Sequence, residues 1–459
     1  MSRRRRLKIT PVLIALNILV IAVIVIFYGT RFIFYYNKFN GKKTSDGTVT
    51  LANEIIKKQS YVDLTSGLVF DEENNIYRYK GNVDDNYIEY SGILYRIVGI
   101  DNENNIKAVS DKVVTLMYSG LEKGFSKSYV NKWLNKSDTE HSGIYKNTMY
   151  ESEKYLSSTY MCNDTIDDLS NITCEDNTND YEMTLLSLYD YANAGGKESY
   201  LNNGESFYLS TLDSNKGNYF ITESGEVGIN KITSKVYGVR PVITFTGKTK
   251  LISGNGTKNE PYQIESHDIN NINDVYVGDI IKFNDSTYKV VSKDEKGIRA
   301  ALNGVLTIDG KEVTRKFSNN NSRLSANSGN LGRYLNIDYY QSMDNKDYLV
   351  GNDWYVSTQT LNNLDYSKVY DSKTFLRIGI LGLSDLFVNE ANNVFTITRG
   401  IESDDVILVL NKEGNIYSDL VTSSYNVRPV FNFKKNIEIK SGNGTIDSPY
   451  VLGELNEEE

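Results

Sequence analysis

The sequence of 459 residues is poor in the residue types that carry most acid–base and thiol chemistry. It contains two histidines, two cysteines and five prolines. A Ser-His-Asp or Cys-His catalytic site would have to use His141 or His267, the only histidines present. We therefore expect no catalytic residue, no metal ligand and no bound cofactor, and we interpret the protein as a non-enzyme.

Basic residues are scarce relative to acidic ones outside the N-terminus. The formal net charge is −9, although the first 43 residues contain nine Lys or Arg and no acid. The remainder of the chain is therefore more acidic than the whole, which excludes nucleic acid as a partner. Aromatic residues at 12% favour a folded chain over a disordered one.

The one long apolar run lies at the N-terminus, from Pro11 to Tyr28, behind a cluster of arginines. Its length and flanks predict a transmembrane helix over residues 9–34, with residues 1–8 in the cytoplasm and everything after the helix outside. A cleaved signal peptide is the alternative, but the run ends without small residues of the A-x-A kind. The pattern therefore predicts a single-pass protein of the cell membrane with a C-terminal ectodomain.

One string of residues occurs twice. Val-Arg-Pro-Val stands at 239–242 and again at 427–430, and each copy is followed by Ser-Gly-Asn-Gly-Thr and Pro-Tyr. The arginine and the serine are 13 residues apart in both copies. Matching intervals between uncommon residues indicate a duplicated module, and each copy is long enough to fold alone.

The repeat and the flanking composition divide the chain into units. Strand-like alternation opens and closes each copy, and helical spacing lies between, over 126–134 and 183–192 in the first copy. We expect an α+β fold, mainly antiparallel, in two tandem domains. The predicted units are a polar stalk (35–81), repeat domain 1 (82–265), a linker (266–274), repeat domain 2 (275–453) and an acidic tail (454–459).

Arginine and proline form the centre of the repeated string. Arg240 and Arg428 could each bind a carboxylate, either one of the protein's own or one of a ligand. We favour an internal ion pair over a bound ligand because both copies keep the arginine. Pro241 and Pro429 predict an edge or a bulge, since proline donates no ladder hydrogen bond.

Glycines follow each proline strand at fixed places. Gly254 and Gly256 in the first copy match Gly442 and Gly444 in the second. A phosphate-binding loop would need a lysine directly after its last glycine and then a helix, but Thr257 and Thr445 stand at that place and no helical pattern follows. We expect tight turns with positive φ in both copies.

Cys162 and Cys174 both lie in one short segment of the first copy. Outside the cell a disulfide is their expected state, and two free thiols are the alternative. Acidic residues crowd the same segment without the spacing of a calcium loop, so we interpret it as a solvated loop rather than a metal site.

The motifs together resemble a known group. Tyr-Arg-Ile-Val-Gly at 95–99, Trp-Leu-Asn at 133–135 and the Val-Arg-Pro-Val ending are similar to uncharacterised membrane-anchored surface proteins of Gram-positive bacteria. The bracketing of helices by terminal strands is similar in layout to C-type-lectin-like and formylglycine-generating-enzyme-like domains. That resemblance implies that the opening strand around Tyr95 or Tyr288 lies beside the closing strand.

The resemblance does not carry an activity over. Formylglycine-generating enzymes use a cysteine pair late in the domain, whereas the two cysteines here lie mid-way in the first copy and the second copy has none. The sugar-binding Glu-Pro-Asn motif of calcium-dependent lectins is replaced by Glu260-Pro261-Tyr262. Neither thiol catalysis nor calcium-dependent sugar binding is implied.

A non-catalytic binding or adhesion module for an envelope polymer or another surface protein is the function we expect. Duplication, the expected anchor and the absence of a repeated catalytic set favour it. Tyr200, Tyr208 and Tyr219 in the loops are the candidate ligand contacts. An envelope assembly component and a carboxylate-based cell-wall hydrolase are the alternatives.

Overall fold

The computed structural model describes residues 17–23, 25–26, 49–60, 63–72, 74–135, 149–231, 235–265, 267–359, 372–382 and 392–456. Most of the predicted membrane helix, 9–34, lies outside these ranges. Residues 17–23 and 25–26 are helical and exposed, but no helix within the described ranges is both long and apolar enough to cross a membrane. A span needs roughly 20 apolar residues. This finding contradicts the expected transmembrane anchor and the single-pass membrane localisation.

The fold is built mainly of strands. Strands account for 39% of the structure and helices for 15%, so the expected α+β class is corrected to a mostly β protein. The cause is local: the segments with helical spacing form short helices only. Helix α3 spans Tyr129–Asn135 and α6 spans Leu188–Ala194, while Met183–Thr184, predicted as helix, is strand β10.

The first copy holds a nine-stranded sheet. Its strands follow the order β1-β2-β4-β5-β15-β10, with β3 beside β4, β16 beside β3 and β7 beside β15. The bounds are β1 Gly67–Asp71, β2 Ile76–Lys80, β3 Tyr87–Tyr90, β4 Ile93–Ile100, β5 Ile106–Ser110, β7 Leu156–Ser157, β15 Val242–Phe245 and β16 Tyr262–Gln263. Residues 67–80, expected in a stalk, therefore belong to this sheet, and helix α2 (Leu51–Ile56) precedes them with its apolar face buried.

A second sheet completes the first copy. Its order is β13-β12-β11-β14-β6, with β11 and β14 parallel. The bounds are β6 Thr115–Met117, β11 Phe207–Leu212, β12 Asn218–Ile221, β13 Val227–Asn230 and β14 Tyr237–Val239. Helix α5 (Ser152–Tyr155) and the hairpin of β8 (Thr159–Cys162) and β9 (Asn177–Tyr181) lie in the chain between the two central helices.

The second copy has two sheets of its own. The larger has the order β26-β31-β19-β18-β17-β33-β32, and the smaller β22-β30-β27-β28-β29, with β24 beside β27. The bounds are β17 Ile280–Phe283, β18 Ser286–Lys293, β19 Ile298–Leu302, β22 Thr314–Lys316, β24 Thr358–Gln359, β26 Ile378–Gly379, β27 Val394–Gly400, β28 Val406–Leu410, β29 Ile416–Leu420, β30 Ser424–Asn426, β31 Val430–Phe433, β32 Ile437–Ser441 and β33 Tyr450–Leu455.

Smaller elements fill the middle of the second copy. A helical segment begins at Leu331 and ends at Ser342, as α7 (Leu331–Arg333), a π-helical stretch (Tyr334–Tyr339) and α8 (Tyr340–Ser342). Two hairpins pair β20 (Thr307–Ile308) with β21 (Lys311–Glu312) and β23 (Asn352–Val356) with β25 (Ser372–Leu376). The helical segment occupies the place in the chain that α3 has in the first copy.

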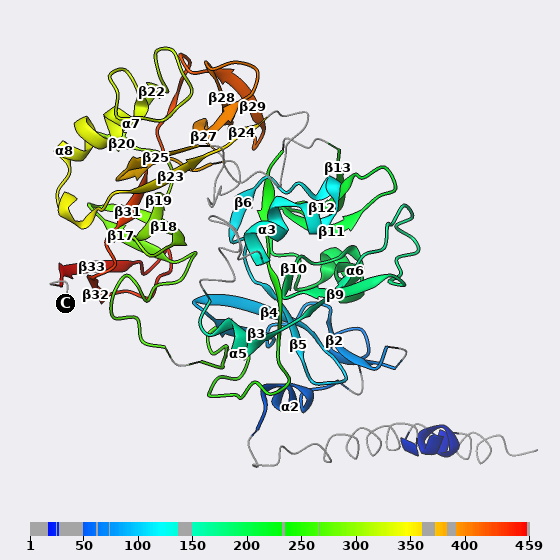
Figure 1. The fold of residues 1–459 in the computed structure, drawn as a ribbon. Helices are drawn as coiled ribbons and strands as arrows, with labels where there is room; N and C mark the ends of the chain where they lie inside the picture. The colour runs from blue at the N-terminus through cyan, green and yellow to red at the C-terminus, as the bar shows by residue number, and fades with distance from the viewer. Residues whose placement is uncertain are drawn as a thin grey trace, which may run out of the picture.

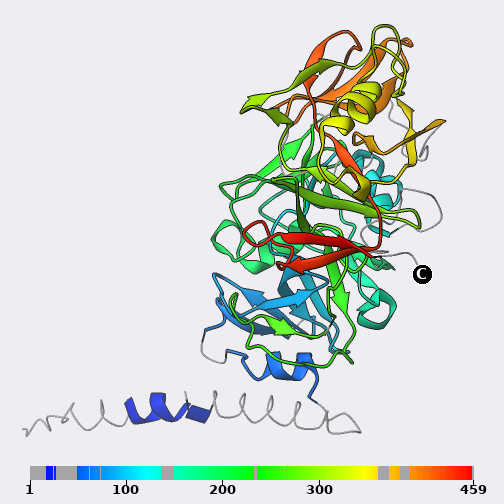
Figure 2. The same cartoon turned by 90° about the vertical axis from the view of Figure 1, so that its left-hand side faces the viewer.

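Both copies arrange their strands in the same order. The first has β10-β15-β5-β4-β3-β16 and the second β26-β31-β19-β18-β17-β33, and each has a five-stranded path beside it. No named strand of one copy pairs with a named strand of the other within the described ranges. Figure 1 shows the second copy, yellow-green to red, as a lobe beside the first, and in Figure 2 the two overlap, with the second copy reaching above the first. The Lys289 ammonium crosses between them and donates to the Val114 carbonyl.

The repeated Val-Arg-Pro-Val string is not one strand. In the first copy β14 ends at Val239 and pairs with β6, whereas β15 begins at Val242 and pairs with β5. The chain changes sheets at Arg240 and Pro241, and proline suits this place because it has no N–H to give to either ladder. The expected adjacency also fails, because β5 lies between the opening strand β4 and the closing strand β15.

Tyrosines form much of the core. Tyr200, Tyr208 and Tyr219, expected as ligand contacts, are each at most 4% exposed. The Tyr208 hydroxyl donates to the Lys235 carbonyl, and the Tyr219 hydroxyl to the Ile166 carbonyl. Tyr208 lies on β11 and Tyr219 on β12. All three tyrosines therefore pack inside the first copy rather than on its surface.

Candidate binding pocket

A pocket of about 590 Å³ opens beside the larger sheet of the first copy. It lies where β2, β4 and β5 meet the start of α6 and the strand β8. Its polar lining includes Arg78, Lys107, Tyr160, Tyr189, Asp190 and Thr244. Pockets of this size hold small ligands or one unit of a polymer.

An ion pair forms one wall of this pocket. Lys107 of β5 points its Nζ at both carboxylate oxygens of Asp190, at 3.0 and 2.9 Å. Burial alone would raise the pKa of Asp190, but Lys107 and the Ser187 N–H outweigh it and lower that pKa. Asp190 is therefore a carboxylate at neutral pH.

Helix capping fixes Asp190 in place. Asp190 is the third residue of α6, and its Oδ2 accepts from the Ser187 N–H at 3.1 Å while the Ser187 hydroxyl accepts from the Asp190 N–H at 3.0 Å. This reciprocal arrangement satisfies two N–H groups that the helix leaves open. Asp190 thus caps the N-terminal end of α6 and pairs with Lys107 through the same carboxylate.

Arginine and tyrosine form a second wall. Arg78 Nε lies 3.3 Å from Asp71 Oδ2, and its Nη2 donates to the Tyr189 hydroxyl at 3.3 Å. Both cations of the pocket therefore have an acid of their own, so the pocket does not select an anion. Thr244 Oγ1 is buried and has no hydrogen-bond partner among the described residues.

Tyr160 supplies an exposed aromatic surface. Its side chain is 42% exposed, and Lys107 Nζ lies 5.7 Å from the centre of its ring. The Tyr160 hydroxyl is 3.2 Å from Cys174 Sγ. An exposed ring beside hydrogen-bonding groups suits ligands that have both an apolar face and hydroxyls.

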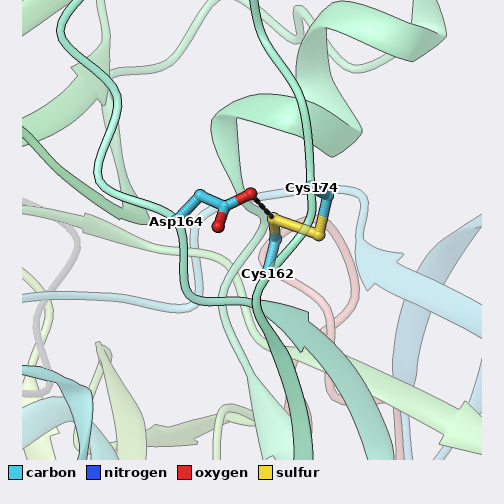
Figure 3. A group of neighbouring side chains, drawn as sticks. All are labelled: Cys162, Asp164 and Cys174. Atoms are coloured by element: carbon cyan, nitrogen blue, oxygen red, sulfur yellow. Dashed lines mark hydrogen bonds between the residues drawn. A yellow bond between two sulfur atoms is a disulfide. The ribbon is translucent and has the colours of Figure 1, made fainter.

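A disulfide joins Cys162, the last residue of β8, to Cys174. Figure 3 shows Asp164 next to this bond, with its Oδ2 3.7 Å from Cys162 Sγ. These three residues are close enough to hold a metal, but the sulfurs are bonded to each other. Asp164 instead accepts the Glu175 and Asp176 N–H groups at 2.6 and 2.9 Å, which closes the loop.

The repeated arginines bind backbone. Arg240 is 1% exposed, and its Nε and Nη1 donate to the Ser110 and Leu201 carbonyls at 2.8 and 2.7 Å. Arg428 Nε donates to the Gly304 carbonyl at 2.6 Å. For Arg240, backbone carbonyls take the place of the ion pair expected from the sequence. The arginine joins the end of β5 to the segment between α6 and β11 at the point where the chain changes sheet.

The four motif glycines all adopt positive φ. The values are 90° and 87° for Gly254 and Gly256, and 103° and 77° for Gly442 and Gly444. A side chain at Gly254 or Gly442 would also collide with the carbonyl oxygen of Pro261 or Pro449. The glycines are therefore turn residues in both copies.

Two carboxyl groups with raised pKa values lie away from the pocket, where the copies meet. Burial raises the pKa of Glu265 to about 7 and that of Asp279 to about 8. Glu265 accepts the Ser91 N–H at 2.6 Å, and Asp279 accepts the Tyr276 N–H at 2.7 Å. A side chain added at Gly92 would lie 2.9 Å from Asp279, so both acids border the Ser91–Gly92 turn.

Comparison with protein-family models, with curated proteins and with solved structures finds no match for this chain. The resemblance to Gram-positive surface proteins and to lectin-like domains therefore stays a prediction.

Sequence reasoning missed the residues of the pocket. Lys107 aligns with Arg299, and Asp190 aligns with Asp385, so both copies carry a basic residue and an acid at matching places. That coincidence is the signal that could have found them. Asp385 itself lies outside the described residues.

Proposed function

We propose that the chain is a binding protein without catalytic turnover, and that the pocket of its first copy holds a neutral, hydroxyl-rich ligand such as a sugar unit of a glycan. The exposed ring of Tyr160 beside the Lys107–Asp190 pair carries this proposal. The C–H face of a sugar stacks on an aromatic ring, and its hydroxyls bind polar groups at the rim. An envelope polymer is one member of this ligand class.

Paired charges support a neutral ligand over an anion. Lys107 and Arg78 each have a carboxylate within 3.3 Å, so an anionic ligand would have to compete with Asp190 and Asp71. The same pairing supports binding without turnover, because a carboxylate with a lowered pKa, such as that of Asp190, is a poor general base. The acids with raised pKa values, Glu265 and Asp279, are not among the pocket's lining residues.

Calorimetric titration of the full chain with a panel of soluble oligosaccharides tests the proposal. We expect at least one to bind, Tyr160→Ala to weaken its binding about tenfold, and Tyr160→Phe to keep most of the affinity, since a stacked ring contributes about 1.4 kcal/mol. Phe375→Ala is the matched control, because Phe375 is 65% exposed on a hairpin of the second copy.

Three results would overturn the proposal. If no oligosaccharide of the panel binds, the ligand is not a glycan. If Tyr160→Ala binds as tightly as the wild type, the ligand does not bind in this pocket. Shortened oligosaccharides in the mass spectrum after incubation with wild type would show turnover and favour a hydrolase.

A further inference from the structure

A second pocket, of about 500 Å³, lies in the second copy and has a different chemistry. It is bordered by the ends of β21 and β22 on one side and by β29 and β30 on the other. Its lining is rich in hydroxyls and amides and has two carboxylates and one lysine. The residues are Glu312, Thr314, Asn393, Lys412, Tyr417, Asp419, Ser423, Ser424, Tyr425 and Asn426.

Three of these side chains form a hydrogen-bonded chain. The Tyr425 hydroxyl donates to Asp419 Oδ2 at 2.5 Å, and the Tyr417 and Tyr425 hydroxyl oxygens are 2.6 Å apart. Burial raises the pKa of Asp419, but hydrogen bonds from Tyr425 and the Leu420 N–H lower it overall. The pKa of Tyr425 is raised by burial and by its two partners.

The order of protons along the chain follows from these contacts. Asp419 is a carboxylate and can only accept, so the Tyr425 hydroxyl donates its hydrogen bond to Asp419. The Tyr425 oxygen then accepts a hydrogen bond from the Tyr417 hydroxyl. Tyr417 is half-buried, and two hydrogen bonds connect it to the Asp419 carboxylate. Since Tyr417 donates its own proton to Tyr425, its oxygen can only accept a further hydrogen bond. The Tyr417 oxygen therefore suits a ligand group that donates a hydrogen bond.

The first copy lacks this chain at the matching positions. Strand pairing aligns Tyr417 with Gly228 and Asp419 with Asn230, because β29 lies against β28 as β13 lies against β12. Tyr425 aligns with Tyr237, which packs on the Phe220 ring at 4.3 Å between ring centres. The acceptor chain is therefore a property of the second copy and not a requirement of the fold.

We propose that this pocket binds an amino sugar through its protonated primary amine, with Tyr417 as the acceptor of an N–H and the Asp419 carboxylate as the source of negative charge. Two carboxylates against one lysine favour a cation. The surrounding Thr314, Asn393 and Ser424 offer groups for the sugar's hydroxyls. The site is independent of the first-copy pocket and gives the chain a second ligand.

The test compares two sugars that differ only at the amine. Titration of the ¹⁵N-labelled full chain with glucosamine and with N-acetylglucosamine at pH 6.5 is followed by NMR. We expect glucosamine to bind at least tenfold more tightly and to shift signals of β29 and β30. Asp419→Asn and Tyr417→Phe should each weaken glucosamine at least fivefold, whereas Glu438→Gln, an equal loss of charge on the other sheet of this copy, should not.

Several outcomes would overturn the proposal. These are equal binding of the two sugars, or glucosamine binding that both variants leave unchanged. Lysine amide binding as tightly as glucosamine would overturn the amino-sugar assignment in favour of a general ammonium site. If Asp419→Asn fails to fold, Tyr417→Phe decides alone, because it removes one oxygen and keeps the ring.

Discussion

Both copies place a basic residue of matching position, Lys107 or Arg299, over an aromatic ring, but the two rings come from different positions. Strand pairing aligns Trp354 with Met161, and Tyr160 with Asp353. Lys107 lies 5.7 Å from the centre of the Tyr160 ring, and Arg299 lies 4.9 Å from that of Trp354. Tyr160 is 42% exposed, whereas Trp354 is 4% exposed and donates its indole N–H to the Leu376 carbonyl. The frame therefore keeps the cation, whereas the position of the ring and its burial differ between the copies, and only the exposed ring is open to a ligand.

The acids described beside these cations come from different elements. Lys107 pairs with Asp190 of helix α6, whereas Asp294, in the turn between β18 and β19, lies 3.4 Å from Arg299 of β19. The Lys107–Asp190 pair connects the start of α6 to the sheet. Repeated strands therefore conserve the frame, and the chemistry of each copy comes from what is attached to it.

The largest effect is expected where the copies are most alike. Arg240→Ala should lower the free energy of unfolding of the first copy by about 3–5 kcal/mol, because it leaves a cavity and two buried carbonyls unpaired. Arg428→Ala should destabilise the second copy in the same direction. Urea unfolding followed by fluorescence measures both, with exposed Arg323→Ala as control. A loss below about 1 kcal/mol for Arg240→Ala would show that the hydrogen bonds of this arginine to Ser110 and Leu201 do not stabilise the first copy.

Removing the disulfide should affect one copy only. Cys162→Ser with Cys174→Ser opens a loop with a sequence separation of 12, which corresponds to about 3 kcal/mol of stability. The second copy has no cysteine, so its unfolding transition should not move. Treatment of the wild type with a reductant should reproduce the loss. A shift in both transitions would mean that the copies unfold as one unit.

The contact between the copies should weaken as pH rises. Glu265 and Asp279 have pKa values of about 7 and 8, above their ordinary values of 4.5 and 3.8. Raised pKa values mean that the folded state holds protons more tightly, so stability is full below about pH 4 and falls as pH rises through 7 and 8. For the deeply buried Asp279 the loss is on the order of a few kcal/mol.

Thermal unfolding between pH 5 and pH 9 measures this dependence. Asp279→Asn should flatten the curve more than Glu265→Gln, because Asp279 is the more deeply buried acid. An exposed acid, Glu402, changed to glutamine serves as the control. A curve that keeps its slope in the double variant would assign the dependence to other groups.

Substitution of equivalent glycines should have similar effects in the two copies. Gly254→Val and Gly442→Val each force a side chain into positive φ and against a proline carbonyl, at a cost of about 1–3 kcal/mol. Gly304→Ala is a milder control, since a side chain there meets nothing within 4 Å although φ is also positive. If ligand binding is lost without a change in melting, the turns belong to a site.

Sequence reasoning found the repeat because the repeated residues are those that the backbone requires. Glycines at positive φ and a proline at a change of sheet leave few alternatives, so they recur at fixed intervals. The change of sheet itself was hidden, since Val239 to Phe245 alternate as a single strand would. Alternation of apolar and polar residues indicates which face of a strand is buried, but it does not indicate which sheet or strand the residues pair with.

The pocket was hidden for a related reason. Lys107, Tyr160 and Asp190 come from a strand, a hairpin and a helix, and only tertiary pairing brings them together. Tyr208 and Tyr219 were placed in loops, although β11 and β12 bury them. A tyrosine suits a core and a binding surface equally well, so composition alone does not separate the two.

The smallest effect is expected for an exposed ion pair of the second copy. Lys373 Nζ lies 3.0 Å from Asp353 Oδ2, and the lysine side chain is 57% exposed. Water screens such a pair, and Lys296 lies 3.2 Å from the same oxygen, so Lys373→Ala should change stability by about 0.5 kcal/mol or less. Asp190→Asn in the first copy should cost about 3 kcal/mol by the same measurement, because it leaves the Lys107 ammonium buried without its acid. Addition of 1 M salt should remove the Lys373 effect and leave most of the Asp190 effect, whereas equal costs for the two variants would mean that burial does not separate these ion pairs.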